Sequence, residues 1–210
     1  MIREYFSNDI LTSLILFSII LILILKKIDN EIFDDNLQLH KKKLLSKLYN
    51  NDFISFRFVN IFYLFVFLIN LSILFTIFSH KEFNLNIFQN NIYYIGLFVF
   101  FKHLLEKFIG WLFKFKRICN NYLNAKLLYF NTLGILVLFL NIFIVFSEYF
   151  NEELVYVSLT VILLYLIISH FTIFFSLKNL IYKNWFYFIL YLCTLEIIPY
   201  YYIISNMINV

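Results

Sequence analysis

The chain has 210 residues, of which 62% are hydrophobic and only 14% are charged, and its net charge is +4. A soluble domain carries roughly a quarter charged residues, so this composition excludes an ordinary soluble protein and favours several membrane-spanning helices. The three glycines and one proline leave no glycine-rich phosphate loop and no linker between domains. We therefore expect residues 1–210 to form a single polytopic membrane domain.

Six apolar segments follow one another along the chain, each near the ~20 residues that a spanning helix needs. The first is predicted to stay in the mature protein, because the N-terminal residues are not basic and Lys26 and Lys27 follow the apolar run in place of a cleavage site. The expected fold is an all-α integral membrane protein with six transmembrane helices. The predicted spans are residues 6–25, 58–78, 92–113, 127–146, 154–175 and 185–204.

The distribution of Lys and Arg predicts the orientation, because these residues are enriched on the cytoplasmic side of a membrane. If both termini lie outside, thirteen of the seventeen fall on the inner side and only Arg3 and Lys81 on the outer side. The net positive charge is thus explained by membrane orientation, and no nucleic-acid partner is expected. The inner residues are Lys26, Lys27, Lys41, Lys42, Lys43, Lys47, Arg57, Lys114, Lys116, Arg117, Lys126, Lys178 and Lys183.

The long polar connection, residues 26–57, begins acidic and becomes basic between Lys41 and Lys47. Leu44, Leu45 and Leu48 lie at helical spacing among these lysines. The pattern is compatible with a loop helix whose lysines only set the topology. It is also compatible with a short helix that binds an anionic membrane surface.

The third segment carries Lys102, His103, Glu106 and Lys107 within its apolar stretch. With the predicted orientation, Lys102 lies ~15 Å from the outer end of its helix, and Glu196 on the sixth segment lies ~16 Å from the inner end. Ionisable groups at such depth need partners in the protein interior. We expect Lys102, Glu106, Lys107 and Glu196 to form one cluster of balanced charge, locking the third and sixth segments together.

Secondary candidates flank this cluster. Pro199 follows Glu196 by three residues and should kink the sixth helix, which frees a backbone carbonyl. His170 lies near the inner boundary. His103 and Glu106 have the spacing of half a di-metal site, but no second copy of the motif follows. Haem ligation by His103 and His170 is disfavoured because their depths differ by ~8 Å. We therefore expect no metal, cofactor or catalytic residue.

Two stretches resemble a known family: KHLLEKFIGWLF at residues 102–113 and FYFILYLCTLEIIPYYYI at residues 186–203. The family is an uncharacterised one of polytopic inner-membrane proteins from Bacteroidota-type bacteria, catalogued as a domain of unknown function. The similarity covers all six segments, and Leu195–Pro199 is its most recognisable piece. It implies a bacterial inner-membrane location. With the orientation predicted from Lys and Arg, both termini would then lie in the periplasm. The resemblance carries no known activity, so it transfers no catalytic residue.

Three functions fit these observations. The leading hypothesis is a non-enzymatic inner-membrane subunit or assembly factor of an envelope complex, in contact with membrane lipids and with a membrane-protein partner or a second copy. The first alternative is a small proton- or ion-coupled transporter in which Glu196, Glu106 and His103 form a relay. The second is a polyprenyl-lipid-handling enzyme with a polar cavity near Lys107, His170 and Lys178.

We predict that Glu196 pairs with the third segment through Lys102, because both lie at nearly the same depth. Glu196→Ala and Lys102→Ala should each lower the melting temperature in detergent, since each leaves a buried charge unpaired. The double variant should lose less than the sum of the two, because it buries no unpaired charge. Additive losses would exclude direct pairing.

Overall fold

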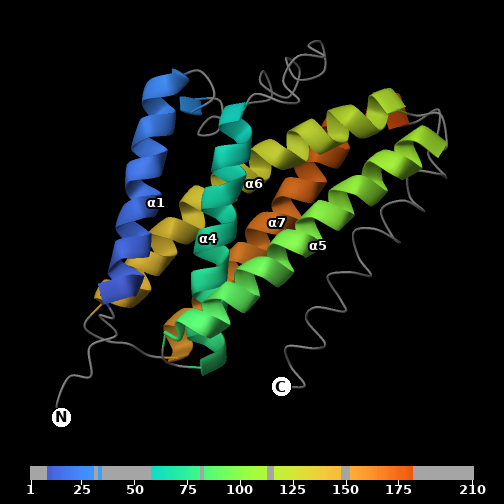
Figure 1. The fold of residues 1–210 in the computed structure, drawn as a ribbon. Helices are drawn as coiled ribbons and strands as arrows, with labels where there is room; N and C mark the ends of the chain where they lie inside the picture. Colours follow the sequence, from blue (N-terminus) through green and yellow to red (C-terminus); the bar gives the residue numbers. More distant parts are fainter. Residues whose placement is uncertain are drawn as a thin grey trace.

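The computed structural model describes residues 9–30, 33–34, 58–80, 83–112, 116–147 and 152–181. These residues form five helices and no strand, so the all-helical prediction is confirmed for this part of the chain (Figure 1). The predicted sixth span, residues 185–204, lies outside the described residues, as does the connection from residue 35 to 57. The helices are α1 (Asp9–Ile28), α4 (Phe58–His80), α5 (Leu85–Leu112), α6 (Lys116–Phe146) and α7 (Glu152–Ile181).

Among the described helices, α1, α4, α6 and α7 are long and apolar enough to cross a membrane, whereas α5 falls short. Helix α5 has the required length. Its first turns, however, contain several amide side chains, and its second half contains Lys102, Glu106 and Lys107. The structure thus supports four of the predicted spans by length and apolar character.

Two helices begin earlier than predicted. Helix α5 starts at Leu85 where the apolar segment was predicted from 92, and α6 starts at Lys116 where the segment was predicted from 127. An apolar segment marks the part of a helix that suits hydrocarbon, whereas the backbone hydrogen bonds continue until Pro, Gly or a capping residue ends them. Neither Pro nor Gly occurs at positions 85–92 or 116–127, and both helices extend into polar sequence.

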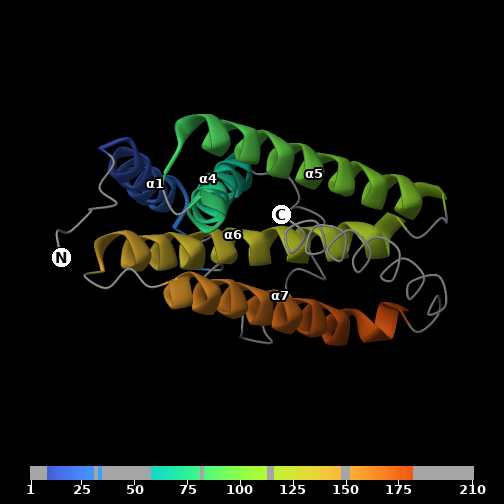
Figure 2. The ribbon, with the colours of Figure 1, turned by 90° about the horizontal axis from the view of Figure 1, so that it is seen from below.

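Helix α6 is the central element of the described bundle. It packs against α4, α5 and α7, and α4 in turn packs against α1 and α5. Figure 2 shows α6 between α7 on one side and the layer of α1, α4 and α5 on the other. The largest apolar cluster lies where α1, α4 and α6 meet, and it includes Leu11, Ile15, Ile73, Leu133 and Val137.

Two pairs of asparagines fix how α4 and α6 are aligned. Asn131 Nδ2 donates to Asn60 Oδ1 at 3.2 Å, and Asn141 Nδ2 donates to the backbone oxygen of Asn70 at 2.8 Å. Both pairs join residues 71 positions apart, so the register advances in the same direction along both helices. Helices α4 and α6 therefore run parallel, and the order of colours along them in Figure 1 agrees.

The α4–α6 contact is close because of one glycine. A Cβ atom added to Gly134 would lie 2.9 Å from both Cα and Cβ of Phe67 and 3.1 Å from its backbone nitrogen. The Phe67 ring stacks on that of Phe130, with the centroids 5.3 Å apart and the planes within 2°. Small residues that let backbones approach are a common basis for helix association in membranes.

We predict that Gly134→Ala destabilises the protein by about 1–3 kcal/mol, because the added methyl group meets backbone that cannot move without separating α4 from α6. Gly96→Ala is the matched control, since a Cβ there meets only Leu68 Cδ1 at 4.0 Å. That variant should be neutral or slightly more stable, because alanine favours helix over glycine. Thermal unfolding in mild detergent measures both, and equal melting temperatures for the two variants would contradict the close contact.

Candidate functional site

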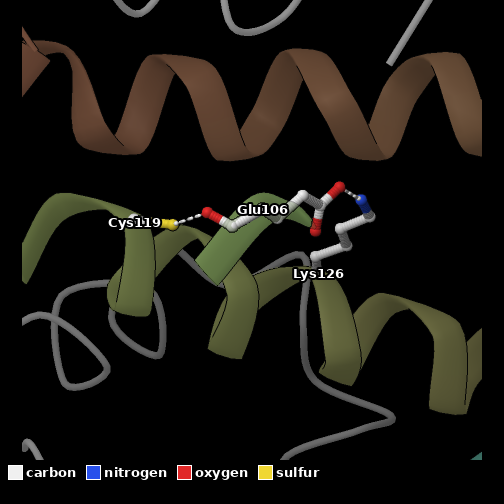
Figure 3. A network of polar contacts seen from close by, with 3 residues as sticks. All are labelled: Glu106, Cys119 and Lys126. Carbon is white, nitrogen blue, oxygen red and sulfur yellow. Dashed lines mark hydrogen bonds and ion pairs between the residues drawn. The ribbon is translucent and has the colours of Figure 1, made fainter. Parts of the chain in front are cut away.

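A buried ion pair joins α5 to α6. Lys126 Nζ lies 2.5 Å from Glu106 Oε1, and the two side chains are 6% and 1% exposed (Figure 3). An ionised carboxylate inside a protein is strongly disfavoured unless a cation or several hydrogen bonds compensate it. The direct contact with Lys126 supplies that cation, so the two charges neutralise each other within the bundle.

The groups around the pair complete its environment. The Lys126 ammonium lies 5.7 Å from the centroid of the Tyr122 ring and 5.8 Å from that of Phe130, so two aromatic faces add cation–π attraction. Cys119, a buried free thiol, donates from Sγ to the backbone oxygen of Glu106 at 3.0 Å. Because Phe130 also stacks on Phe67, the site is connected through packing to α4.

Helical spacing explains why these side chains meet. Lys102, Glu106 and Gly110 are buried and recur every four residues, so they form one stripe along α5. Cys119, Tyr122 and Lys126 recur at three and four residues on α6 and turn toward that stripe. Helix α5 ends at Leu112 and α6 begins at Lys116, so the two helices form a hairpin that brings the stripes together.

The outward side of α5 is apolar, with Phe100, Leu104, Phe108 and Trp111 among its exposed residues. In its second half, α5 therefore buries Lys102 and Glu106 and exposes mainly apolar side chains, with Lys107 as the exposed charge. This pattern is the reverse of that in a soluble protein, and it suits a helix that contacts lipid.

The structure brings together part of the predicted charge cluster. Lys102 is buried one turn from Glu106, and its ammonium lies 5.9 Å from the centroid of the Phe98 ring. His103 is half-buried and Lys107 is exposed. Glu196 and Pro199 lie outside the described residues, so the pairing of Glu196 with Lys102 stays a prediction.

His170 lies on a different helix from the residues of the ion pair. It is half-buried on α7, and its Nδ1 is 2.7 Å from the backbone oxygen of Leu166, one turn earlier on the same helix. The predicted cavity near Lys107, His170 and Lys178 stays a prediction. Within the residues that the structure describes, no group of three or more His, Cys, Asp or Glu side chains is placed to hold a metal ion.

Lys126 is the functional residue that sequence reasoning missed. It was predicted to lie in an inner loop because the fourth apolar segment begins only at 127. The loop placement is wrong, because Lys126 is the eleventh residue of α6, whereas its side of the membrane stays a prediction. One signal was present in the sequence. Without Gly or Pro at 116–127 the helix extends to Lys116, and the resulting hairpin places Lys126 on a helix beside Glu106.

Further polar atoms are buried along the central helices. Of the described side chains, five atoms on α4 and α6 are shielded from solvent and have no hydrogen-bond partner within the protein. Buried polar groups are generally satisfied, and in membrane proteins ordered water often provides the partner. The atoms are Tyr63 OH, Asn121 Nδ2, Tyr129 OH, Asn131 Oδ1 and Asn141 Oδ1.

Comparison with known proteins gives one match. The family described as "Domain of unknown function (DUF4271)" matches residues 10–207 of the chain. This agrees with the expected resemblance to a family catalogued as a domain of unknown function. No curated protein and no solved structure matches the chain.

We predict that Glu106→Ala and Lys126→Ala each destabilise the protein by about 2–4 kcal/mol, because each leaves one buried charge without its counter-ion. The double variant should lose less than the sum of the two. Lys107→Ala, which removes an exposed charge from the same helix, serves as the control and should change little. Unfolding in mild detergent measures all four proteins. Strictly additive losses for Glu106 and Lys126 would show that the pair does not stabilise the fold.

Proposed function

Because the chain belongs to the family of the Domain of unknown function (DUF4271), whose description assigns no activity, we propose its function from the geometry: a non-enzymatic subunit or assembly factor of an envelope complex. In this proposal it is a six-span helix bundle in a bacterial inner membrane, with both termini in the periplasm. The observation that carries the proposal is the ion pair between Glu106 and Lys126.

The pair supports a scaffold because its geometry is that of a packing contact. Each side chain is almost fully buried, the two charges cancel, and aromatic rings cover the ammonium. Such a contact holds two helices in one arrangement. The remaining surface of the described bundle is rich in large apolar side chains on α1, α5 and α7, which suit contact with lipid and with another membrane protein.

The direction of the helices supports the crossing of α5. Helices α4 and α6 are both apolar enough to span, and the asparagine pairs show that they run parallel. Two consecutive spans in the same direction require the chain to return across the membrane between them. Helix α5 lies between them in sequence, and its 28 residues have a length of ~42 Å, more than the ~30 Å hydrocarbon core.

Exposed aromatic residues support the same placement of α5. Tyr93 and Tyr94, near one end, are 64% and 68% exposed, and Trp111, near the other end, is 66% exposed. Tyrosine and tryptophan are enriched where a spanning helix meets the two membrane surfaces. The rise from Tyr93 to Trp111 is ~27 Å, close to the thickness of the hydrocarbon core. With α5 crossing and a sixth span at 185–204, both termini lie on the same side.

A second candidate function is a proton- or ion-coupled transporter. The observation in its favour is the set of five buried polar atoms without a protein partner on α4 and α6. A relay requires water or mobile protons between such groups, whereas a structural lock requires only paired ones. Glu106 and His103 are the described residues of the relay, and Glu196 is its predicted third member.

Purification in mild detergent, followed by reconstitution into liposomes, separates the two functions. A scaffold should co-purify with a fixed partner in constant ratio, and Lys126→Ala should reduce that recovery while Lys107→Ala should not. The liposomes should then leak protons no faster than empty ones. Proton flux that disappears in Glu106→Gln, together with the absence of a fixed partner, would overturn the scaffold in favour of the transporter.

A further inference from the structure

Among the described helices, the one that does not qualify as a span also carries the buried acid. Helix α5 contains Glu106, and it is the described helix that does not qualify as a span by its own composition. The lysine that pairs with Glu106 lies 20 residues later, in α6, which does qualify. The negative charge of Glu106 opposes the entry of α5 into hydrocarbon. It is compensated by Lys126, which belongs to the next helix in the chain.

From this arrangement we infer that α5 and α6 enter the membrane together as a hairpin, and that Lys126 is the residue that makes the insertion of α5 possible. The inference rests on the proposed topology, in which α5 spans the membrane. An ionised carboxylate on an isolated helix is disfavoured at membrane depth. A helix that arrives with its counter-ion already in contact presents a neutral pair instead.

The geometry of the hairpin suits joint insertion. The buried stripe of α5 meets α6 at Glu106, and the outward side of α5 carries many exposed apolar side chains. The Tyr122 and Phe130 rings near the ammonium belong to α6 itself. The Cys119 thiol of α6 also donates to the backbone oxygen of Glu106, which adds a second contact between the two helices. The hairpin therefore keeps the Glu106–Lys126 pair inside, while the outward side of α5 carries exposed apolar side chains together with the exposed Lys107.

The substitution Lys126→Leu distinguishes joint insertion of α5 and α6 from an insertion that depends only on the apolar character of each helix. Lys126→Leu makes α6 more apolar, so a simple hydropathy rule predicts insertion at least as good as in the wild type. If Lys126 neutralises Glu106, the same change leaves the acid without its counter-ion and α5 should fail to cross. Adding Glu106→Gln removes the acid and should restore the crossing. Lys107→Leu removes one positive charge from an exposed position of α5 and controls for the orienting effect of lysine.

The test follows the sidedness of two reporter cysteines in the full chain, with Cys119 and Cys193 replaced by Ser. Asn84→Cys reports the residue before α5, and Ser147→Cys reports the residue after α6. The chains are synthesised in the presence of membrane vesicles and labelled at once with a maleimide that does not cross membranes. Newly made chains are read before degradation, so a variant that later fails to fold is still scored.

In the wild type both reporters should lie on the same side. In Lys126→Leu the fraction with Ser147→Cys on the opposite side should rise at least about tenfold, and Glu106→Gln in the same chain should reverse this rise. If Lys126→Leu keeps both reporters on one side, joint insertion is overturned while the six-span proposal stands. If the reporters lie on opposite sides in the wild type, α5 does not cross, and both the six-span proposal and this inference are overturned.

Discussion

A carboxylate placed among apolar helices has to meet a cation, and the bundle described here depends on that requirement. Glu106 turns inward from α5, and Lys126 meets it from α6. The contact determines which face of α5 is buried, because the stripe that holds Glu106 must face α6. It also explains why the outward side of α5 is rich in apolar residues although α5 does not qualify as a span by its own composition. The charges are thus compatible with a membrane only in the folded arrangement.

Other contacts of α6, between uncharged groups, determine how this helix is aligned with its neighbours. The asparagine pairs set the register against α4, and Gly134 brings the two backbones close. On the opposite side, Tyr165 of α7 donates to Thr132 Oγ1 at 2.7 Å. Helix α6 therefore holds each neighbour by a specific polar or steric contact. In lipid such contacts matter because apolar surface alone gives little preference for one helix partner over another.

The sequence was sufficient for the fold class and for the buried stripe of α5, because apolar segments of membrane length and charges within them are local patterns. Lys102 and Glu106 were identified in this way, and both are buried. Lys126 was missed because its position relative to an apolar segment says nothing about where its helix begins. Its partner also lies on another helix, so the pairing depends on how the hairpin packs, which no local pattern contains.

The asparagines of α4 and α6 illustrate the same limit. Asn60, Asn70, Asn131 and Asn141 are polar residues within apolar segments, and all four are buried. Their sequence spacing gave no means of choosing partners. The equal separation of 71 residues has meaning only once α4 and α6 are known to lie side by side. Parallel alignment followed from tertiary packing, and it supports the proposed return of α5 across the membrane.

The outward side of α5 has a consequence for how freely its sequence can vary. Lipid chains are fluid and adapt to any side-chain outline, so Phe100, Leu104 and Phe108 need to be apolar without needing a particular shape. Glu106 and Gly110 lie one turn apart on the buried side of α5, where neighbouring protein atoms leave little space. Glu106 must also keep its contact with the charged Lys126. The outward face of α5 therefore tolerates many apolar substitutions, whereas its buried face tolerates few. The difference is between the two faces of the helix and not between its two ends.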